Sequence, residues 1–348
     1  VSWSNISGLW SLMCTSSNKN LYLKNELITN LVIPDSVTSI ASYSFSGCES
    51  LTSVTIPDSV TSIGESAFYG CSGLSSMTIP SSVTSIGAQA FYNCTGELIM
   101  NSAIVETNYT SSSYPAYSNS YWLYGAKFTK LTIGSTIEKI GDYVFRNCSS
   151  LQSVTIPDGV MRIGSCAFLD CENLTSVTIP QGIKGIESVV FSNCRSLKLV
   201  NIPDSVKSIG NLAFSHCSSL KRITIPYGVV SIGDHAFGSC DNLESVIIPD
   251  SVTSIGSYAF PNCDALTEIT IPDSVTSIGR FAFSDCTSLT SVIIPDGVTT
   301  IAEYAFDNCT SLTSVTIGNG VTTIGNYAFY NCKNLKDVYY VGTQDDRS

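Results

Sequence analysis

The chain has 348 residues, of which 43% are hydrophobic and only 13% are charged, and its net charge is −11. This composition is too apolar for a disordered chain, and no run of about 18 apolar residues predicts a membrane-spanning helix. The excess of negative charge argues against nucleic acid or an anionic membrane surface as a partner, because both are bound through basic patches.

Residues 1–27 precede a periodic region and are predicted to form an N-terminal cap, in which Trp3 and Trp10 would cover the first repeat. Residues 28–340 are predicted to form one repeat array with an irregular part at 95–133. Residues 341–348 are predicted to be a polar C-terminal tail.

The array has a period of 23, which is the step from Cys48 to Cys71. Twelve of the fourteen Cys residues fall in register, each one period after the one before, except across the gap from Cys94 to Cys148. The repeat reads L-x-x-V-T-I-P-D-S-V-T-S-I-G-x-x-A-F-x-x-C-x-x. A fixed period of about 20–29 residues is typical of solenoids, whose units bury their apolar faces against neighbouring units.

Every repeat predicts the same elements in the same order. In the second repeat, Val54 and Ile56 alternate with polar residues, which predicts a strand with one buried face. Pro57 ends this strand because it lacks a backbone donor, and a second extended segment follows that buries Val60 and Ile63. The A-F-x-x-C segment is too short for an independent α-helix and is predicted to form a single helical or 3₁₀ turn.

Stacking of these repeats predicts about fourteen parallel strands on one long sheet, with the extended segments and short turns on the other side. The strands are expected to begin near Ile28, Leu51, Leu74, Glu97, Phe128 and Leu151, and then once in every period to Leu335.

One segment breaks the period. The spacing of 54 between Cys94 and Cys148 equals 2 × 23 + 8, which predicts one degraded coil with eight extra residues. The sequence "ELIMN" at 97–101 would replace a strand there, and "YWLYG" at 121–125 would replace the turn.

The inserted residues combine Tyr with Ser and Asn, which is the composition of binding loops. Two interpretations remain open: these rings contact a ligand, or they only cover the degraded coil. The tyrosines concerned are Tyr109, Tyr114, Tyr117 and Tyr121. Under the first interpretation Tyr114, Tyr117 and Tyr121 project from the coil, while Trp122 or Leu123 points inward.

The Cys column has two readings, a set of disulfides or metal ligands and a column of buried free thiols. Side chains of stacked parallel strands keep their Cβ atoms about 4.8 Å apart, beyond the usual range for a disulfide. No C-x-x-C pair with zinc spacing occurs. Buried free thiols are therefore predicted.

Two further sets of polar residues have a possible chemical role. Asp250, Asp273 and Asp296 recur in one register, where they would either line a cation-binding edge or cap their own turns. His216 and His235 have no nucleophile or carboxylate at a recognisable spacing and are predicted to be solvated or packed. No catalytic residue, metal site or cofactor is predicted.

The outward positions of the predicted strands are mostly Ser and Thr, which would give a plain soluble sheet. This face changes in the middle and at the end of the array, where Arg222, Glu268 and Tyr339 occur. Variation on an otherwise uniform scaffold is where a binding surface is expected. These three residues are therefore candidate ligand contacts.

The period of 23 and the A-F-x-x-C turn resemble the BspA-like class of leucine-rich repeat from residue 28 to about residue 338. The resemblance implies a right-handed solenoid in a cell-surface or secreted bacterial protein, in some cases one that adheres to matrix proteins, and it brings no catalytic residues. In the broader leucine-rich pattern an Asn follows the strand. Here Ser59, Ser251 or Gly159 holds that position, so the usual asparagine ladder is not expected.

Three classes of function remain open for such a solenoid: a binding module for a host matrix protein, surface protein or glycan; a passive spacer; and a polysaccharide-acting enzyme. Such an enzyme needs paired carboxylates at a defined separation. Glu268 and Asp337 are the acidic residues expected on the outward strand positions, and three strands would separate them by about 14 Å. We therefore expect a non-enzymatic, adhesin-like binding protein, extracellular or at the cell surface, monomeric and not inserted in a membrane, with a spacer as the alternative.

Overall fold

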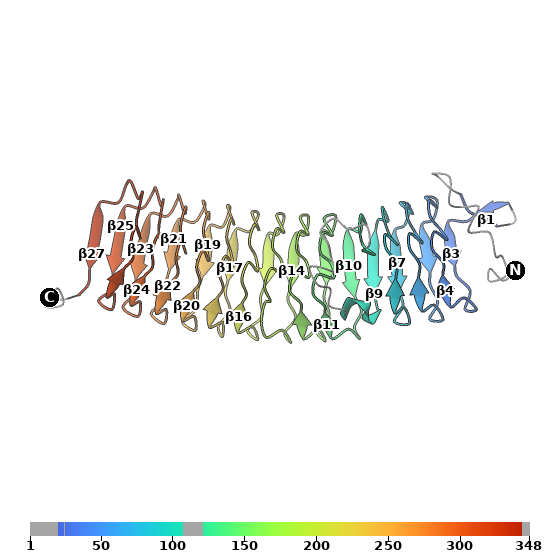
Figure 1. The fold of residues 1–348 in the computed structure, drawn as a ribbon, viewed down its shortest axis with the longest axis horizontal. Helices are drawn as coiled ribbons and strands as arrows, with labels where there is room; N and C mark the ends of the chain where they lie inside the picture. The colour runs from blue at the N-terminus through green and yellow to red at the C-terminus, as the bar shows by residue number, and fades with distance from the viewer. Residues whose placement is uncertain (1–19, 24, 107–120, 343–348) are drawn as a thin grey trace. The chain divides into compact units, whose positions relative to one another are not determined.

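The computed structural model describes residues 20–23, 25–106 and 121–342. Two compact units divide the chain: Val1–Val160 with Asp170–Leu174, and Met161–Leu169 with Thr175–Ser348. Each unit is a parallel β-solenoid in which every coil contributes one main strand, and most coils also contribute a second, two-residue strand (Figure 1). The predicted repeat solenoid is confirmed.

The first unit opens with an antiparallel hairpin of β1 (Tyr22–Leu23) and β2 (Glu26–Leu27), inside the segment predicted as a cap. Its main strands are β3 (Asn30–Val32), β5 (Ser53–Thr55), β7 (Ser76–Ile79), β9 (Glu97–Met100), β10 (Lys130–Ile133) and β12 (Ser153–Thr155). Its second side carries β4 (Ser39–Ile40), β6 (Ser62–Ile63), β8 (Ser85–Ile86), the 3₁₀ helix η2 (Ala103–Glu106) and β11 (Lys139–Ile140).

The second unit continues the same pattern. Its main strands are β14 (Ser176–Thr178), β15 (Leu199–Asn201), β17 (Arg222–Thr224), β19 (Ser245–Ile247), β21 (Glu268–Thr270), β23 (Ser291–Ile294), β25 (Ser314–Ile317) and β27 (Asp337–Tyr340). Its second strands are β13 (Arg162–Ile163), β16 (Ser208–Ile209), β18 (Ser231–Ile232), β20 (Ser254–Ile255), β22 (Ser277–Ile278), β24 (Thr300–Ile301) and β26 (Thr323–Ile324).

The fourteen predicted main strands are all present, six in the first unit and eight in the second. Neighbouring strands pair in parallel with equivalent residues opposite each other, as Ser314 opposite Asp337 shows. Within the second unit the main ladder is interrupted between β15 and β17 and between β19 and β21, whereas the second-strand ladder runs unbroken from β16 to β26. The second strands therefore keep the coils in register where the main ladder opens.

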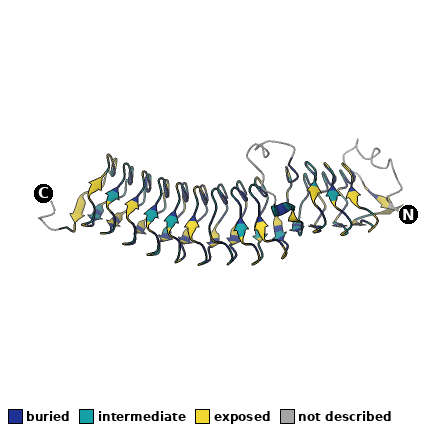
Figure 2. Ribbon diagram, turned by 60° about the horizontal axis from the view of Figure 1, so that its bottom comes forward, coloured by how far each residue is buried: buried dark blue, intermediate teal, exposed yellow. Residues whose placement is uncertain are grey.

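The core of each coil follows the repeat, with inward positions buried and outward positions more exposed (Figure 2). In the regular stretches the Phe of one A-F-x-x-C segment stacks on the Phe of the next, and the ring centroids of Phe237 and Phe260 lie 5.2 Å apart with an interplanar angle of 5°. Such offset stacking adds to the hydrophobic burial of the rings. The Phe column is therefore a continuous apolar contact within each regular stretch.

The A-F-x-x-C segment differs from the predicted helical or 3₁₀ turn. The Ala67 N–H group donates to the carbonyl three residues earlier, at 3.3 Å, but the next N–H group, that of Phe68, donates to Ala90 O in the following coil, at 2.8 Å. Ser66 and Gly70 adopt left-handed backbones with φ of 51° and 75°. A 3₁₀ turn would use successive donors within its own coil, whereas this alternation leaves every second donor for the neighbour.

The Cys column satisfies a backbone acceptor. The Cys217 Sγ–H group donates to Phe191 O at 3.3 Å, and Cys71 makes the same bond to Phe45 O at 3.1 Å. Equivalent bonds occur at Cys94, Cys171, Cys194, Cys240, Cys263, Cys286, Cys309 and Cys332. All thirteen Cys residues in the described part are present as thiols.

A serine ladder stands where leucine-rich repeats usually have asparagine. The Ser59 hydroxyl donates to Val37 O at 2.7 Å, and the Ser251 hydroxyl donates to Val229 O at 2.8 Å. Ser82, Ser205 and Ser274 make the same bond. A short hydroxyl therefore links the coils at the end of the main strand.

The irregular coil distributes its extra residues unevenly. β9 confirms the strand predicted at "ELIMN", and it pairs with β7 through Ser76 and Glu97, two positions short of a full period. The next pairing joins Glu97 to Lys130, ten positions more than a full period. The eight extra residues are thus the sum of a coil two residues short and a coil ten residues long.

The expectation that Tyr121 projects from this coil is wrong. Tyr121 is only 8% exposed, because its ring packs against Trp122 with the centroids 5.7 Å apart. The prediction that Trp122 or Leu123 points inward is confirmed for both, at 2% and 5% exposure. Tyr109, Tyr114 and Tyr117 lie outside the described residues.

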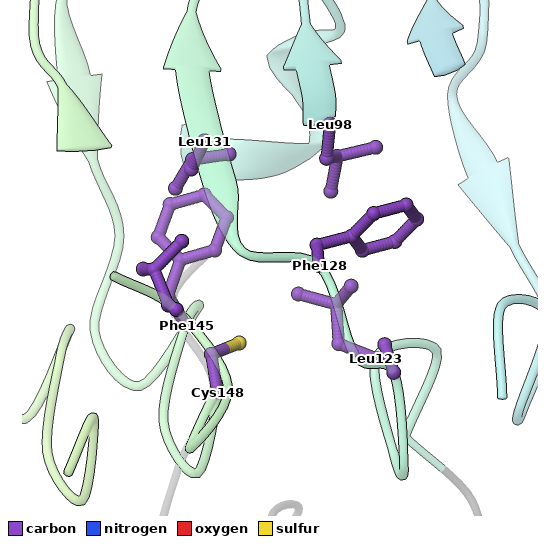
Figure 3. Close-up of a pocket in the computed structure, with 8 residues that line it drawn as sticks. Leu98, Leu123, Phe128, Leu131, Phe145 and Cys148 are labelled. Atoms are coloured by element: carbon purple, nitrogen blue, oxygen red, sulfur yellow. The ribbon is translucent and has the colours of Figure 1, made fainter. Parts of the chain in front are cut away.

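A small internal cavity of about 10 Å³ adjoins this coil (Figure 3). Ala126 closes the turn there by donating its N–H to Leu123 O at 3.0 Å, as Cys94 does to Phe91 O at 2.9 Å. Ala and Leu are smaller than the Cys and Phe of a regular coil, and the space they leave is lined by apolar side chains, Phe128 among them. Its size is close to that of one water molecule, so it is a packing defect rather than a ligand site.

Candidate binding surface

The outward face of the main sheet in the second unit departs from the Ser and Thr pattern. Leu199, Ile247 and Ile293 are each more than 60% exposed on strands where most coils have Ser or Thr, and Tyr339 is 57% exposed. Large apolar side chains gain nothing from folding when they remain in water. Their positions therefore mark this face as a candidate binding surface.

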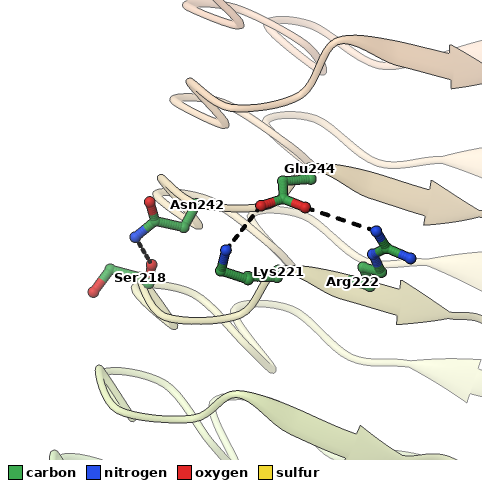
Figure 4. A network of polar contacts seen from close by, with 5 residues as sticks. All are labelled: Ser218, Lys221, Arg222, Asn242 and Glu244. Carbon is green, nitrogen blue, oxygen red and sulfur yellow. Dashed lines mark hydrogen bonds and ion pairs between the residues drawn. The ribbon is translucent and has the colours of Figure 1, made fainter.

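A polar network lies on the same face, at the start of β17 (Figure 4). Lys221 Nζ lies 3.0 Å from Glu244 Oε1, and Arg222 Nη2 lies 4.0 Å from Glu244 Oε2. Glu244 is the equivalent of Lys221 in the next coil, one period later. The hydrogen bond and charge of Lys221 hold the pKa of the Glu244 carboxyl below its usual value, so the pair stays ionised near neutral pH.

Two more basic residues precede this network by one coil. Lys198 is the equivalent of Lys221, and Arg195 lies three residues before it; both are exposed. The Arg195 Nε–H group donates to Asn193 Oδ1 at 2.7 Å. Positive charge is thus concentrated on two successive coils of an acidic chain.

A shallow groove of about 270 Å³ runs beside the outward column near Ile293 and is lined by Thr270 and Thr316 together with Asp273 and Asp296. Asp296 Oδ1 accepts the Asn319 N–H of the next coil at 2.9 Å. This Asp therefore links two coils, whereas the sequence predicted that it would cap its own turn or bind a cation.

A second groove, of about 390 Å³, lies on the turn side of the second unit and includes His216, His235 and Asp307. A column of stacked rings borders it, in which His235 lies 4.5 Å from Tyr258 and Phe281 lies 4.7 Å from Tyr258, centroid to centroid. The packed interpretation of His235 is confirmed. The rings cover each other's faces, so only their edges are open to a partner.

The candidate residues predicted from the sequence do not form one cluster. Arg222 lies on β17, Glu268 on β21 two coils later, and Tyr339 on β27 three coils beyond that. All three lie on the outward face of the main sheet. Of the three, Arg222 belongs to the polar network described above. The sequence reasoning missed Lys198, Lys221 and Glu244, although reading one repeat position along the chain in steps of one period would have found them.

In the part of the chain that the structure describes, no group of three or more His, Cys, Asp and Glu side chains is placed to hold a metal ion. Within the same residues, none of the helices is both long and apolar enough to cross a membrane.

A sequence model described as the BspA type leucine-rich repeat region matches residues 15–123, 116–244 and 230–344 of the chain. The parallel solenoid and its repeat define a leucine-rich-repeat protein. The chain belongs to the BspA-type leucine-rich-repeat family.

Several solved bacterial leucine-rich-repeat structures are similar to this chain. One from Bacteroides ovatus is 30% identical, with 89% of this chain and 78% of that chain covered and a TM-score of 0.63. A leucine-rich cell surface protein from Faecalibacterium prausnitzii is 30% identical, with 92% and 89% covered and a TM-score of 0.40. A protein from Eubacterium ventriosum is 26% identical, with 74% and 76% covered and a TM-score of 0.46. No curated protein matches the chain.

Proposed function

We propose that this chain is a non-enzymatic, adhesin-like binding protein, outside the cell or on its surface, that recognises a host protein or a glycan. The observation that carries the proposal is the outward face of the second unit, where Leu199, Arg222, Ile247 and Ile293 replace the Ser and Thr of other coils. Exposed apolar side chains beside a charged network on a rigid scaffold are typical of recognition surfaces.

The backbone of the repeats supports this role by holding the outward side chains in fixed places. Most N–H and C=O groups of the main strands pair with neighbouring coils, as in the register of Glu268 with Ser291. A partner therefore meets mainly the outward side chains of these coils. We place Arg222, Glu268 and Tyr339 among the contacting residues.

Arguments against an enzyme come from the carboxylates of the main strands. Glu97 bonds the Thr132 hydroxyl at 2.6 Å and pairs with Lys130 at 3.0 Å, which holds the pKa of its carboxyl below the usual value. Glu268 and Asp337 lie on β21 and β27, which are three coils apart. Neither arrangement gives the closely spaced acid and base that glycosidic cleavage requires.

A passive spacer is the second candidate. The observation that favours it is the uniform Ser and Thr face of coils such as those of β5 and β12, which would need no specific residues. A spacer would bind nothing through its outward face, and substitutions there would leave every interaction of the parent protein unchanged.

The test compares two sets of apolar-to-polar substitutions in the purified chain. The first set restores the repeat consensus on the main face, with Leu199→Ser, Ile247→Thr and Ile293→Thr. The matched control changes exposed apolar residues on the second-strand side, with Met161→Thr and Val230→Thr, which are 56% and 48% exposed. Both are screened against matrix proteins and a glycan array.

We expect the screen to find a ligand of the parent chain. The first set of substitutions should weaken binding of this ligand at least about tenfold, and the control should bind it as the parent does. Absence of any ligand, or a ligand bound equally by both variants, favours the spacer. Cell fractionation with an antibody to the chain tests the location, and recovery in the cytosol alone contradicts it.

A further inference from the structure

Four exposed basic side chains lie on two successive coils of the second unit. Arg195 and Lys198 belong to the coil of β15, and Lys221 and Arg222 belong to the coil of β17. The side chains of Lys221 and Arg222 are 67% and 79% exposed. We call these four residues the basic patch.

The negative charge that pairs with the basic patch comes from the next coil. Glu244 pairs with Lys221 and Arg222 at 3.0 and 4.0 Å, and Asp241 is exposed at the preceding turn. Four positive side chains therefore lie on these two coils, and Glu244 is paired with two of them, in a chain whose net charge is −11. The overall charge of the protein conceals a local surface of the opposite sign.

The geometry of the basic patch limits what it can bind. Lys198 and Lys221 occupy the same position in successive coils, so they follow each other along the stack, one coil apart. The surface is open, and each exposed charge contributes little on its own because solvent screens it. Useful affinity then requires a ligand that carries several negative charges in a row.

We propose that the basic patch binds an anionic polysaccharide that carries sulfate or carboxylate groups on successive sugars. The inference rests on the proposed function and adds the chemistry of the partner. The planar guanidinium groups of Arg195 and Arg222 suit bidentate contacts with sulfate or carboxylate, and the two Lys residues add point charges along the same line. The exposed Leu199 side chain, 64% open beside Lys198, gives an apolar contact for a sugar ring.

Glu244 has a double role in this arrangement. It holds Lys221 and Arg222 in place in the absence of a ligand, and it competes with the ligand for them. Replacing Glu244 by Gln keeps the shape of the side chain and removes its charge. The change therefore strengthens binding of a polyanion and weakens binding of a cationic partner.

The experiment measures heparin binding to the intact chain at physiological ionic strength. The variant Lys198→Ala/Arg222→Ala removes two charges from the basic patch. The matched control Lys184→Ala/Lys207→Ala removes two exposed Lys residues from the second-strand side. Lys207 directly precedes β16, and Lys184 holds the same position one coil earlier. Both variants change the net charge by the same amount.

We expect the first variant to bind heparin about tenfold more weakly and the control to match the parent. Glu244→Gln is expected to bind a few-fold more tightly, and binding by the parent is expected to fall steeply with added salt. Neutral dextran is expected not to bind, which would show that charge and not the sugar itself is recognised.

Equal loss in both double variants would show only diffuse electrostatics and would overturn the proposal. Equally tight binding of poly-glutamate would point to an acidic peptide, and equally tight binding of duplex DNA would point to nucleic acid, and either result replaces the polysaccharide. If heparin does not bind but the matrix or glycan screen still finds a ligand of the main face, this inference fails and the proposed function stands. If neither binds, both fail.

Discussion

The thiol of Cys71 and the backbone carbonyl of Phe45 lie 3.1 Å apart, across the boundary between two coils. The carbonyl also accepts the N–H group of Cys48 at 3.2 Å, so the thiol supplies its second hydrogen bond. Cys is the right size for the interior and brings a weak donor, which Ala and Val lack. The repeated Cys is therefore explained by hydrogen bonding between coils.

Replacing Cys217 by Ala is expected to lower the free energy of unfolding by about 1–3 kcal/mol, because it leaves a void and takes one donor from Phe191 O. Urea denaturation measures the change. Cys332→Ala is the control, since Cys332 is only half-buried and lies on the last Cys-containing turn, and its effect is expected to be smaller. Equal effects at both positions would contradict the packing argument.

The buried thiols predict a loss of stability in alkali. Burial raises the pKa of Cys240 and Cys286 to about 12, from an ordinary value near 9. Below pH 9 the folded and unfolded states are both protonated, so the full stability is present. Above pH 9 the unfolded thiols release protons that the folded ones keep, so stability falls until about pH 12, by about 1.4 kcal/mol per pH unit for each thiol.

Measurement of the unfolding free energy from pH 8 to 11 checks this slope. In Cys240→Ala the slope should be shallower by roughly the contribution of one thiol, about 1.4 kcal/mol per pH unit. An unchanged slope would mean that this thiol titrates alike in both states.

The serine ladder gives opposite predictions for two glycines of the repeat. A side chain at Gly159 would meet its nearest neighbours, Ser135 O and Ile137 O, at 3.5 and 3.8 Å, whereas one at Gly297 would collide with Asp273 O. Gly159→Ser should therefore stabilise the protein by about 0.5–1 kcal/mol, through a hydrogen bond to the preceding coil and a less flexible unfolded chain.

Gly297→Ser should instead destabilise the protein by more than about 1 kcal/mol, because the backbone must move to admit the side chain. Thermal melts of the two variants beside the parent separate these outcomes. If both melting temperatures shift in the same direction, the space around each Gly does not decide whether a Ser at that position stabilises the protein.

The column of outer rings makes a prediction about backbone conformation. Phe281 stacks on Tyr258 and Tyr304, each at 4.7 Å, and has a left-handed φ of 53°. Phe281→Ala loses both ring contacts and keeps a side chain in the unfavourable left-handed region. Phe281→Gly also loses the contacts, but Gly adopts a left-handed φ without strain. The Gly variant should be the more stable of the two by about 1 kcal/mol.

The inner Phe283 is the control for that comparison, because it also stacks on the rings of both neighbouring coils but the left-handed residues of its turn are Phe281 and Asp285. At Phe283 the order should reverse, with Ala more stable than Gly by a few tenths of a kcal/mol to about 1 kcal/mol. Chemical denaturation of the four variants decides between the two orders.

Tyr121 is now expected to stabilise the fold. Its ring is buried against Trp122, so Tyr121→Ser should cost about 2–4 kcal/mol, comparable to other large-to-small changes in a core. Calorimetry of the variant checks this value. The exposed Tyr124, 38% accessible, is the control, and Tyr124→Ser should have a smaller effect.

The sequence predicted the regular coils well because each signal is local. The alternation around Val54 and the missing donor of Pro57 define a strand and its end within a few residues, and the constant period then fixes the partner of every strand. The parallel register of β5 with β7 follows from that period.

Other features depend on atoms in neighbouring coils and left no local signal. The turn was predicted as helical because its left-handed positions hold residues such as Ser66 and Phe281 and rarely the Gly that normally marks such a φ. Tyr121 was expected to project because composition describes a whole segment and cannot say which ring turns inward. The basic patch was missed because net charge averages over all coils.

The bonds between coils also run in one direction. Each regular turn receives a thiol from the coil after it and sends its own thiol to the coil before it, as Cys240 does to Phe214 and Cys263 does to Phe237. An in-frame duplication of one repeat in the gene would therefore add a coil whose donors and acceptors all find partners. The array can therefore lengthen or shorten by whole repeats at little cost to the fold, and the number of coils can vary between related genes while every coil keeps the same bonds.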